Sequence, residues 1–202
     1  QPLDMAMAHV MTLASVDRPV GDDVRPGEAE ERALARRCLD GDAQAFSVLV
    51  RLHGAAVHRF CVRLVGPSMA EEVAQETFAR CWTRLGEFRW ESSLRSWLFR
   101  IALNLCRDHL KSARVRDDAA ARSDVEETDP ARGPEGEAVG QQTLAAVQRA
   151  VARLPPKYRE AFVLKHVEDL SYEEMQAIVG LEVGALKVRV HRARNMLKAL
   201  LE

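Results

Sequence analysis

The segment LSYEEMQAIVGLEVGALKVRVHRARNMLKALLE (170–202) decides the fold of the C-terminal part of the chain. Ser171 and Glu174 have the spacing of a capping box, which predicts that a short helix begins there. Gly180 permits a left-handed turn, and the apolar pattern predicts a second helix from about residue 183. Two helices joined by a tight glycine turn form the helix-turn-helix pattern.

The second helix of this pattern has a basic surface. Between residues 183 and 198 the chain has five Lys or Arg side chains and one His, with no Asp or Glu. Such a helix suits the major groove of DNA, where Arg and Lys donate hydrogen bonds to guanine edges and phosphates. A helical hairpin that only packs against a protein partner is the alternative interpretation.

The composition predicts an all-α protein. The chain has 202 residues, of which 47% are hydrophobic, 29% are charged and only 5% are aromatic. Alternating β-branched runs are missing, so helix is favoured over strand. No run approaches the roughly 18 apolar residues that a membrane span requires, so we expect no direct membrane insertion and an intracellular protein.

The charge distribution divides the chain into two small helical domains. The formal net charge is −1, but 28–115 has 14 basic and 11 acidic side chains, and 141–202 has 10 and seven. Residues 116–140 have three basic and eight acidic side chains with several Pro and Gly, so we expect a flexible acidic linker. Residues 1–27 are similarly predicted to be a loose N-terminal extension.

Three helices are predicted in the first domain, over 43–65, 69–85 and 94–114. The second is expected to begin with a capping box of Ser68 and Glu71, to bury a face that includes Trp82, and to expose an acidic face. Acidic side chains in a first turn also complement the helix dipole, so this face has a purely structural explanation as well. The third helix has a stripe of polar side chains at steps of three and four: Arg100, Asn104, Arg107, Lys111 and Arg114.

The basic stripe and the connector before it suit nucleic acid. Asp108 is the only acidic residue between 92 and 116, so phosphate contact competes with a merely solvated basic face. In the connector 86–93, Phe88 and Trp90 flank a cation and have the chemistry to stack on unpaired bases. The alternative is that these rings cover the ends of the flanking helices.

Neither a metal site nor a catalytic motif is predicted. The four cysteines lack CxxC spacing and are expected to be small buried residues with free thiols. His53, His58 and Cys61 share one helix, but their spacing does not suit a tight ligand set. Phosphate-binding loops, HExxH and nucleophile elbows do not occur, so we expect no enzyme, no cofactor and no small-molecule substrate.

Four segments in order resemble the bacterial extracytoplasmic-function sigma factors, the promoter-specificity subunits of RNA polymerase. The resemblance covers about 30–202 and rests on these segments: MAEEVAQETFARCW (69–82), FRWESSLRSWLFRIALNLCRDHL (88–110), LPPKYREAFVLKHVEDLSYEEM (154–175) and VGALKVRVHRARNML (183–197).

The resemblance implies a role for each surface. It implies that core RNA polymerase binds a set on the helix 69–85: Glu71, Glu72, Val73, Gln75, Glu76 and Phe78. It implies that the promoter's minus-ten element is melted and read by a second set: Phe88, Trp90, Glu91, Ser92, Ser93, Arg95, Arg100, Asn104 and Arg107. It implies that the minus-thirty-five element is read by a third set: Lys187, Val188, Arg189, His191, Arg192 and Arg194.

The resemblance also implies a cytoplasmic bacterial protein that directs promoter-specific initiation, with promoter DNA, core RNA polymerase and an anti-sigma factor as partners. The reading helix departs from the family pattern, because Ala185 and Val188 stand where Thr and Ser are common. The alternatives are a stand-alone helix-turn-helix regulator that binds an operator without polymerase, and a helical adaptor without a DNA role.

Overall fold

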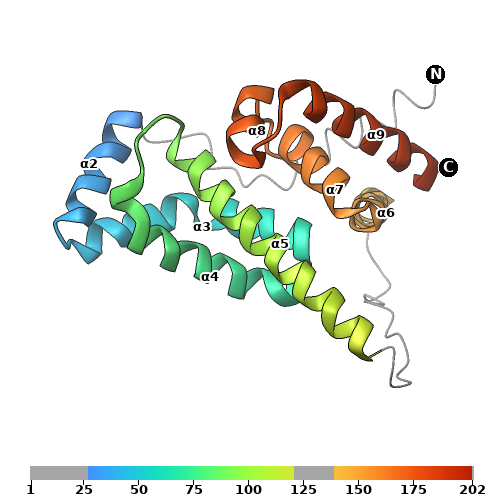
Figure 1. The fold of residues 1–202 in the computed structure, drawn as a ribbon, viewed down its shortest axis with the longest axis horizontal. Helices are drawn as coiled ribbons and strands as arrows, with labels where there is room; N and C mark the ends of the chain where they lie inside the picture. The colour runs from blue at the N-terminus through green and yellow to red at the C-terminus, as the bar shows by residue number, and fades with distance from the viewer. Residues whose placement is uncertain (1–26, 121–138, 202) are drawn as a thin grey trace.

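The structure is a computed structural model, and it describes residues 27–120 and 139–201. Those residues form helices and connecting turns without strands, which confirms the predicted all-α class. The first group of elements is α2 (Glu28–Leu39), α3 (Ala43–Val65), α4 (Pro67–Arg84), the 3-10 turn η1 (Leu85–Glu87) and α5 (Leu94–Ala120). The second group is α6 (Val139–Arg153), α7 (Pro156–Phe162), the π-helical turn η2 (Val163–Val167), α8 (Tyr172–Val179) and α9 (Val183–Leu201) (Figure 1).

The first group is built around α3, which packs against α2, α4 and α5. Phe60 of α3 stacks on Phe99 of α5 with ring centroids 4.7 Å apart, and both rings are fully buried. Burial of one such side chain stabilises a fold by roughly 1.5–3 kcal/mol. The prediction that Trp82 is buried is wrong: the indole is 41% exposed and lies edge-on to Phe46, because that side of α4 faces solvent.

Proline decides where α4 begins. Its N-cap is Gly66, with φ 83°, and Pro67 occupies the first turn without a side-chain cap. The predicted capping box of Ser68 and Glu71 is therefore wrong, because the fixed φ of proline starts the helix before Ser68 is reached.

The helix-turn-helix of the second group forms as predicted. The Ser171 hydroxyl accepts a hydrogen bond from the Glu174 N–H at 3.1 Å, and the Glu174 carboxylate accepts one from the Ser171 N–H at 2.8 Å. Gly180 has φ 76° and ends α8 in the left-handed region. Met175 of α8 and Leu186 of α9 are fully buried in the core, and the two helices pack against each other.

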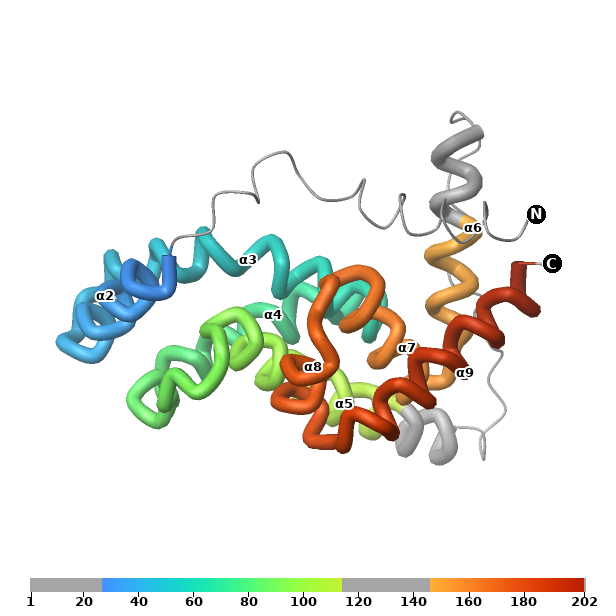
Figure 2. The backbone as a smooth tube through the Cα atoms, turned by 90° about the horizontal axis from the view of Figure 1, so that it is seen from above, coloured from blue at the N-terminus to red at the C-terminus, as the bar shows by residue number. Residues whose placement is uncertain are grey.

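The two groups contact each other directly. α8 packs against α5 (Figures 1 and 2). α6 and α7 also contact α3. α5 continues to Ala120, so the first part of the stretch predicted as linker is helical. Residues 121–138 of that linker and nearly all of the predicted N-terminal extension lie outside the described residues, while the last two linker residues, 139–140, already belong to α6.

All four cysteines are buried with free thiols, as predicted. Burial raises the pKa of the Cys81 thiol to about 12. Among the described residues, His53 lies 3.2 Å from Glu31, no cluster could hold a metal ion, and no helix is long and apolar enough to cross a membrane.

Candidate nucleic-acid and polymerase interfaces

The exposed face of α9 carries the cations that the sequence singled out. The buried positions Leu186, Val190, Ala193 and Leu197 fix the rotation of the helix. The opposite surface is therefore open to solvent. Five of the six predicted minus-thirty-five residues are exposed and Arg189 is half-buried; the exposed ones are Lys187, Val188, His191, Arg192 and Arg194.

Two tyrosines that sequence reasoning missed support this cationic face. The Lys187 ammonium lies 5.6 Å from the centre of the Tyr172 ring, and the Lys165 ammonium lies 5.2 Å from the same ring. Arg192 donates a hydrogen bond to the Tyr158 hydroxyl at 3.5 Å, and this contact lowers the pKa of Tyr158. Neither tyrosine belongs to the basic pattern of α9, so only packing reveals the contacts.

The connector before α5 is an aromatic cluster. Phe88 stacks on Trp97 at 5.0 Å and contacts Trp90 at 4.8 Å between ring centroids. Trp90 is half-buried, and the Arg32 guanidinium lies 5.1 Å from its ring centre. Its φ of 58° lies in the left-handed region, which side chains other than glycine rarely adopt. Such strained positions cluster at functional sites.

The other connector residues have distinct surroundings. The Ser93 hydroxyl accepts a hydrogen bond from the Ser96 N–H at 3.1 Å, so Ser93 caps the start of α5. Glu91 is exposed and Ser92 is half-buried. The connector therefore combines a helix cap with a pair of partly exposed rings.

Only some of the predicted minus-ten residues on α5 are open to solvent. Arg100 and Asn104 are exposed. Arg95 donates a hydrogen bond to the Glu168 carboxylate at 2.6 Å, and Arg107 forms a bidentate pair with Glu160 at 3.0 and 2.7 Å.

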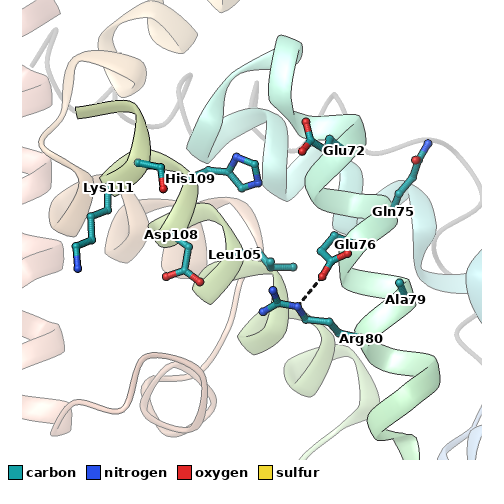
Figure 3. Close-up of a pocket in the computed structure, with 10 residues that line it drawn as sticks. Glu72, Gln75, Glu76, Ala79, Arg80, Leu105, Asp108, His109 and Lys111 are labelled. Carbon is teal, nitrogen blue, oxygen red and sulfur yellow. Dashed lines mark hydrogen bonds and ion pairs between the residues drawn. The ribbon is translucent and has the colours of Figure 1, made fainter. Parts of the chain in front are cut away.

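An open groove of about 1110 Å³ separates α4 from α5. Its α4 wall includes Glu72, Gln75 and Glu76, as Figure 3 shows, and its α5 wall includes Asp108 and His109. Three carboxylate or amide groups of the predicted polymerase-binding set thus border one hollow.

Some residues of the predicted polymerase-binding set lie on the surface and others are buried in the core. Glu71 is exposed and accepts a hydrogen bond from Gln75 at 2.8 Å. Glu76 is half-buried and pairs with Arg80 at 2.8 Å. Val73 and Phe78 are buried in the core of the first group, so they shape α4 from within.

Comparison with known proteins assigns the two helical groups. The model of Sigma-70 region 2 matches residues 49–116, and that of Sigma-70 region 4 matches residues 144–197. RNA polymerase sigma factor NccH of Alcaligenes xylosoxydans xylosoxydans is 35% identical over 176 residues, which cover 85% of this chain and 95% of NccH. The chain belongs to the extracytoplasmic-function (ECF) sigma factors.

Two further similarities agree with the ECF family. ECF RNA polymerase sigma factor SigW of Bacillus subtilis is 31% identical, with 78% of this chain and 89% of SigW covered. The solved sigma factor RpoE in complex with the anti-sigma factor NepR from Bartonella quintana is 28% identical, with a TM-score of 0.64. That match covers 79% of this chain and 98% of RpoE. Sigma factors are specificity subunits of transcription, so this ECF chain directs core RNA polymerase to promoters, as the resemblance implied.

Proposed function

We propose that this ECF sigma factor uses three separate surfaces in initiation, and that it acts without catalysis in the bacterial cytoplasm. Residues 28–115 would act as region 2 and residues 141–202 as region 4, a division that the matched spans 49–116 and 144–197 support. The observation that carries the proposal is the exposed cationic face of α9, held in a capped helix-turn-helix.

The groove between α4 and α5 docks core polymerase in this proposal. Its lining includes the carboxylates of Glu72, Glu76 and Asp108 as well as the cations Arg80 and Lys111. Glu72 and Gln75 are exposed on its rim, and Glu76 lines it from α4. Exposed carboxylates steer association with a basic partner surface and contribute to its specificity.

The connector and the open part of α5 act on the minus-ten element. Phe88 and Trp90 offer partly exposed rings to unpaired bases, and stacking contributes about 1–3 kcal/mol per base. Arg100 and Asn104 lie exposed on α5 beyond this cluster and suit the phosphates and bases of the separated strand.

Lys187, His191 and Arg192 read duplex DNA at the minus-thirty-five element. Val188 is 50% exposed between them and offers an apolar contact, such as that with a thymine methyl group. We also propose regulation by an anti-sigma factor, since the similar RpoE was solved in complex with one.

Run-off transcription with purified core polymerase tests the docking surface. Glu72→Lys with Glu76→Lys reverses two charges of the groove, and we expect loss of core binding and of promoter-specific transcripts with unchanged helicity. The matched control is Glu28→Lys with Glu30→Lys, which makes the same charge change at exposed positions of α2. Equal core affinity of the two double variants would refute the docking assignment.

Run-off transcription also distinguishes a sigma factor from a stand-alone helix-turn-helix regulator. A stand-alone regulator would bind an operator without polymerase and would tolerate the groove substitutions. Failure of the wild-type protein to support initiation from any promoter in a cognate library would refute the proposed function.

A further inference from the structure

Two glutamates of the second helical group are buried against arginines of the first. Glu160 is 6% exposed and Glu168 is 8% exposed. Glu160 accepts both hydrogen bonds of a bidentate pair with Arg107, and Glu168 accepts one from Arg95. The Arg63 guanidinium lies 3.9 Å from the other oxygen of Glu168.

A side chain to backbone hydrogen bond also joins the same two groups. Arg159 of α7 donates a hydrogen bond to the Leu64 carbonyl at 2.8 Å, in the last turn of α3. A cation at that position also interacts favourably with the helix dipole. The two groups of helices therefore meet at several charge-assisted contacts, whose partners come from α3, α5, α7 and the turn after η2.

Arg95 and Arg107 belong to the set that the resemblance assigns to the minus-ten element, and they flank the exposed Arg100 and Asn104 along α5. Guanidinium groups bind carboxylates and phosphates with the same planar, bidentate geometry, so a glutamate can occupy the position that a phosphate would take. The hydrogen bond from Arg107 to the Glu160 carboxylate also raises the pKa of Arg107.

We propose that Glu160 and Glu168 act as an intramolecular substitute for DNA phosphates and close the second domain over the strand-binding face of α5 in the free protein. The inference rests on the proposed role of that face. Arg100 and Asn104 stay exposed between the two locked ends, so the closed state obstructs a continuous strand but does not remove the whole surface.

Ion pairs of this kind allow the two domains to associate and separate reversibly. When the domains separate, the charged groups are hydrated again, so the free-energy cost of their desolvation is recovered. The net stabilisation by a buried ion pair is therefore modest. A closed fraction of about nine-tenths would lower the apparent affinity for single-stranded DNA about tenfold. Binding of core polymerase to the first domain can then shift the population to the open state.

The test measures domain separation in the full chain. Ala55→Cys and Ala199→Cys introduce exposed thiols on α3 and α9 for fluorescent labels, while the four native cysteines are buried. Glu160→Gln with Glu168→Gln should move the labels apart and broaden their distance distribution. The matched control, Glu173→Gln with Glu182→Gln, removes two exposed charges of the same domain and should leave the distance unchanged.

An exchange of the two charges in the Arg107–Glu160 pair distinguishes domain opening from misfolding. Arg107→Glu alone should open the domains, and addition of Glu160→Arg should close them again, which misfolding would not produce. Circular dichroism should show equal helicity for every variant.

The second readout is binding of a fluorescein-labelled single-stranded DNA of random sequence and about 20 nucleotides. The Glu160→Gln, Glu168→Gln variant should bind about tenfold more tightly than wild type, and the control variant should not. An unchanged label distance, an unchanged DNA affinity or an equal gain in the control would each overturn the inference. Run-off transcription by the wild type tests the proposed function separately, because neither readout here uses polymerase.

Discussion

Substitutions of Trp90 separate backbone strain from ring contacts in the connector. The residue has φ 58°, contacts Phe88 with ring centroids 4.8 Å apart, and has the Arg32 guanidinium 5.1 Å from its ring centre. Trp90→Ala removes the ring but keeps a side chain in the left-handed region. Trp90→Gly removes the ring and also the strain.

The two variants should differ in their free energy of unfolding, because only Trp90→Gly relieves the backbone strain. Loss of the aromatic pair costs about 0.5–1.5 kcal/mol and loss of the cation–π contact about 0.5–1 kcal/mol. These two contacts therefore account for about 1–2.5 kcal/mol of the destabilisation by Trp90→Ala, in addition to the lost burial of the half-buried ring. Glycine relieves about 1–2 kcal/mol of left-handed strain but adds about 0.4–1 kcal/mol of unfolded-state entropy. Trp90→Gly should therefore be more stable than Trp90→Ala by up to about 1.6 kcal/mol.

Urea denaturation at constant pH measures the stability difference, and run-off transcription measures the function. Both variants should transcribe poorly from duplex promoters and recover partly on pre-melted ones, because both lack the ring. A Trp90→Gly protein less stable than Trp90→Ala would refute the strain argument. Equal losses on duplex and pre-melted templates would refute the melting role.

Three further predictions concern the second domain. Burial, with smaller effects of Arg194 and Lys165, lowers the pKa of His166 from 6.5 to about 4. The unfolded chain therefore binds a proton that the fold excludes, and stability should fall as the pH drops from 6.5 towards 4; His166→Phe should flatten this slope in urea midpoints measured across that range. Ser171→Ala removes the capping box and should cost about 1 kcal/mol in thermal denaturation, whereas an unchanged melting temperature would contradict the cap's contribution. Lys187→Ala with Arg192→Ala should weaken promoter binding by the holoenzyme and reduce its salt dependence by about two counterions, and an unchanged salt slope would argue against phosphate or base contact by these cations.

The sequence predicted those features that depend on neighbouring residues. The Ser171 capping box and the Gly180 turn formed as expected, because both are local hydrogen-bond and backbone preferences. The predicted start of α4 was wrong because a different local preference decided it. Pro67 begins the helix before the predicted cap at Ser68. The exposure of Trp82 was not predicted, because helical periodicity indicates the direction of the buried face of a helix. It does not indicate how much of that face the neighbouring helices cover.

The sequence by itself determined the all-α class, the helix-turn-helix and the basic face of α9, since helical periodicity, caps and glycine turns act within a few residues. Tertiary structure alone decided which cations are available. Arg107 pairs with Glu160 across 53 residues, and Arg95 pairs with Glu168 across 73. No spacing encodes such partners, because the chain must fold before they meet. The sequence pattern predicted one polar stripe on α5, whereas packing buries Glu160 against Arg107 and leaves Arg100 exposed.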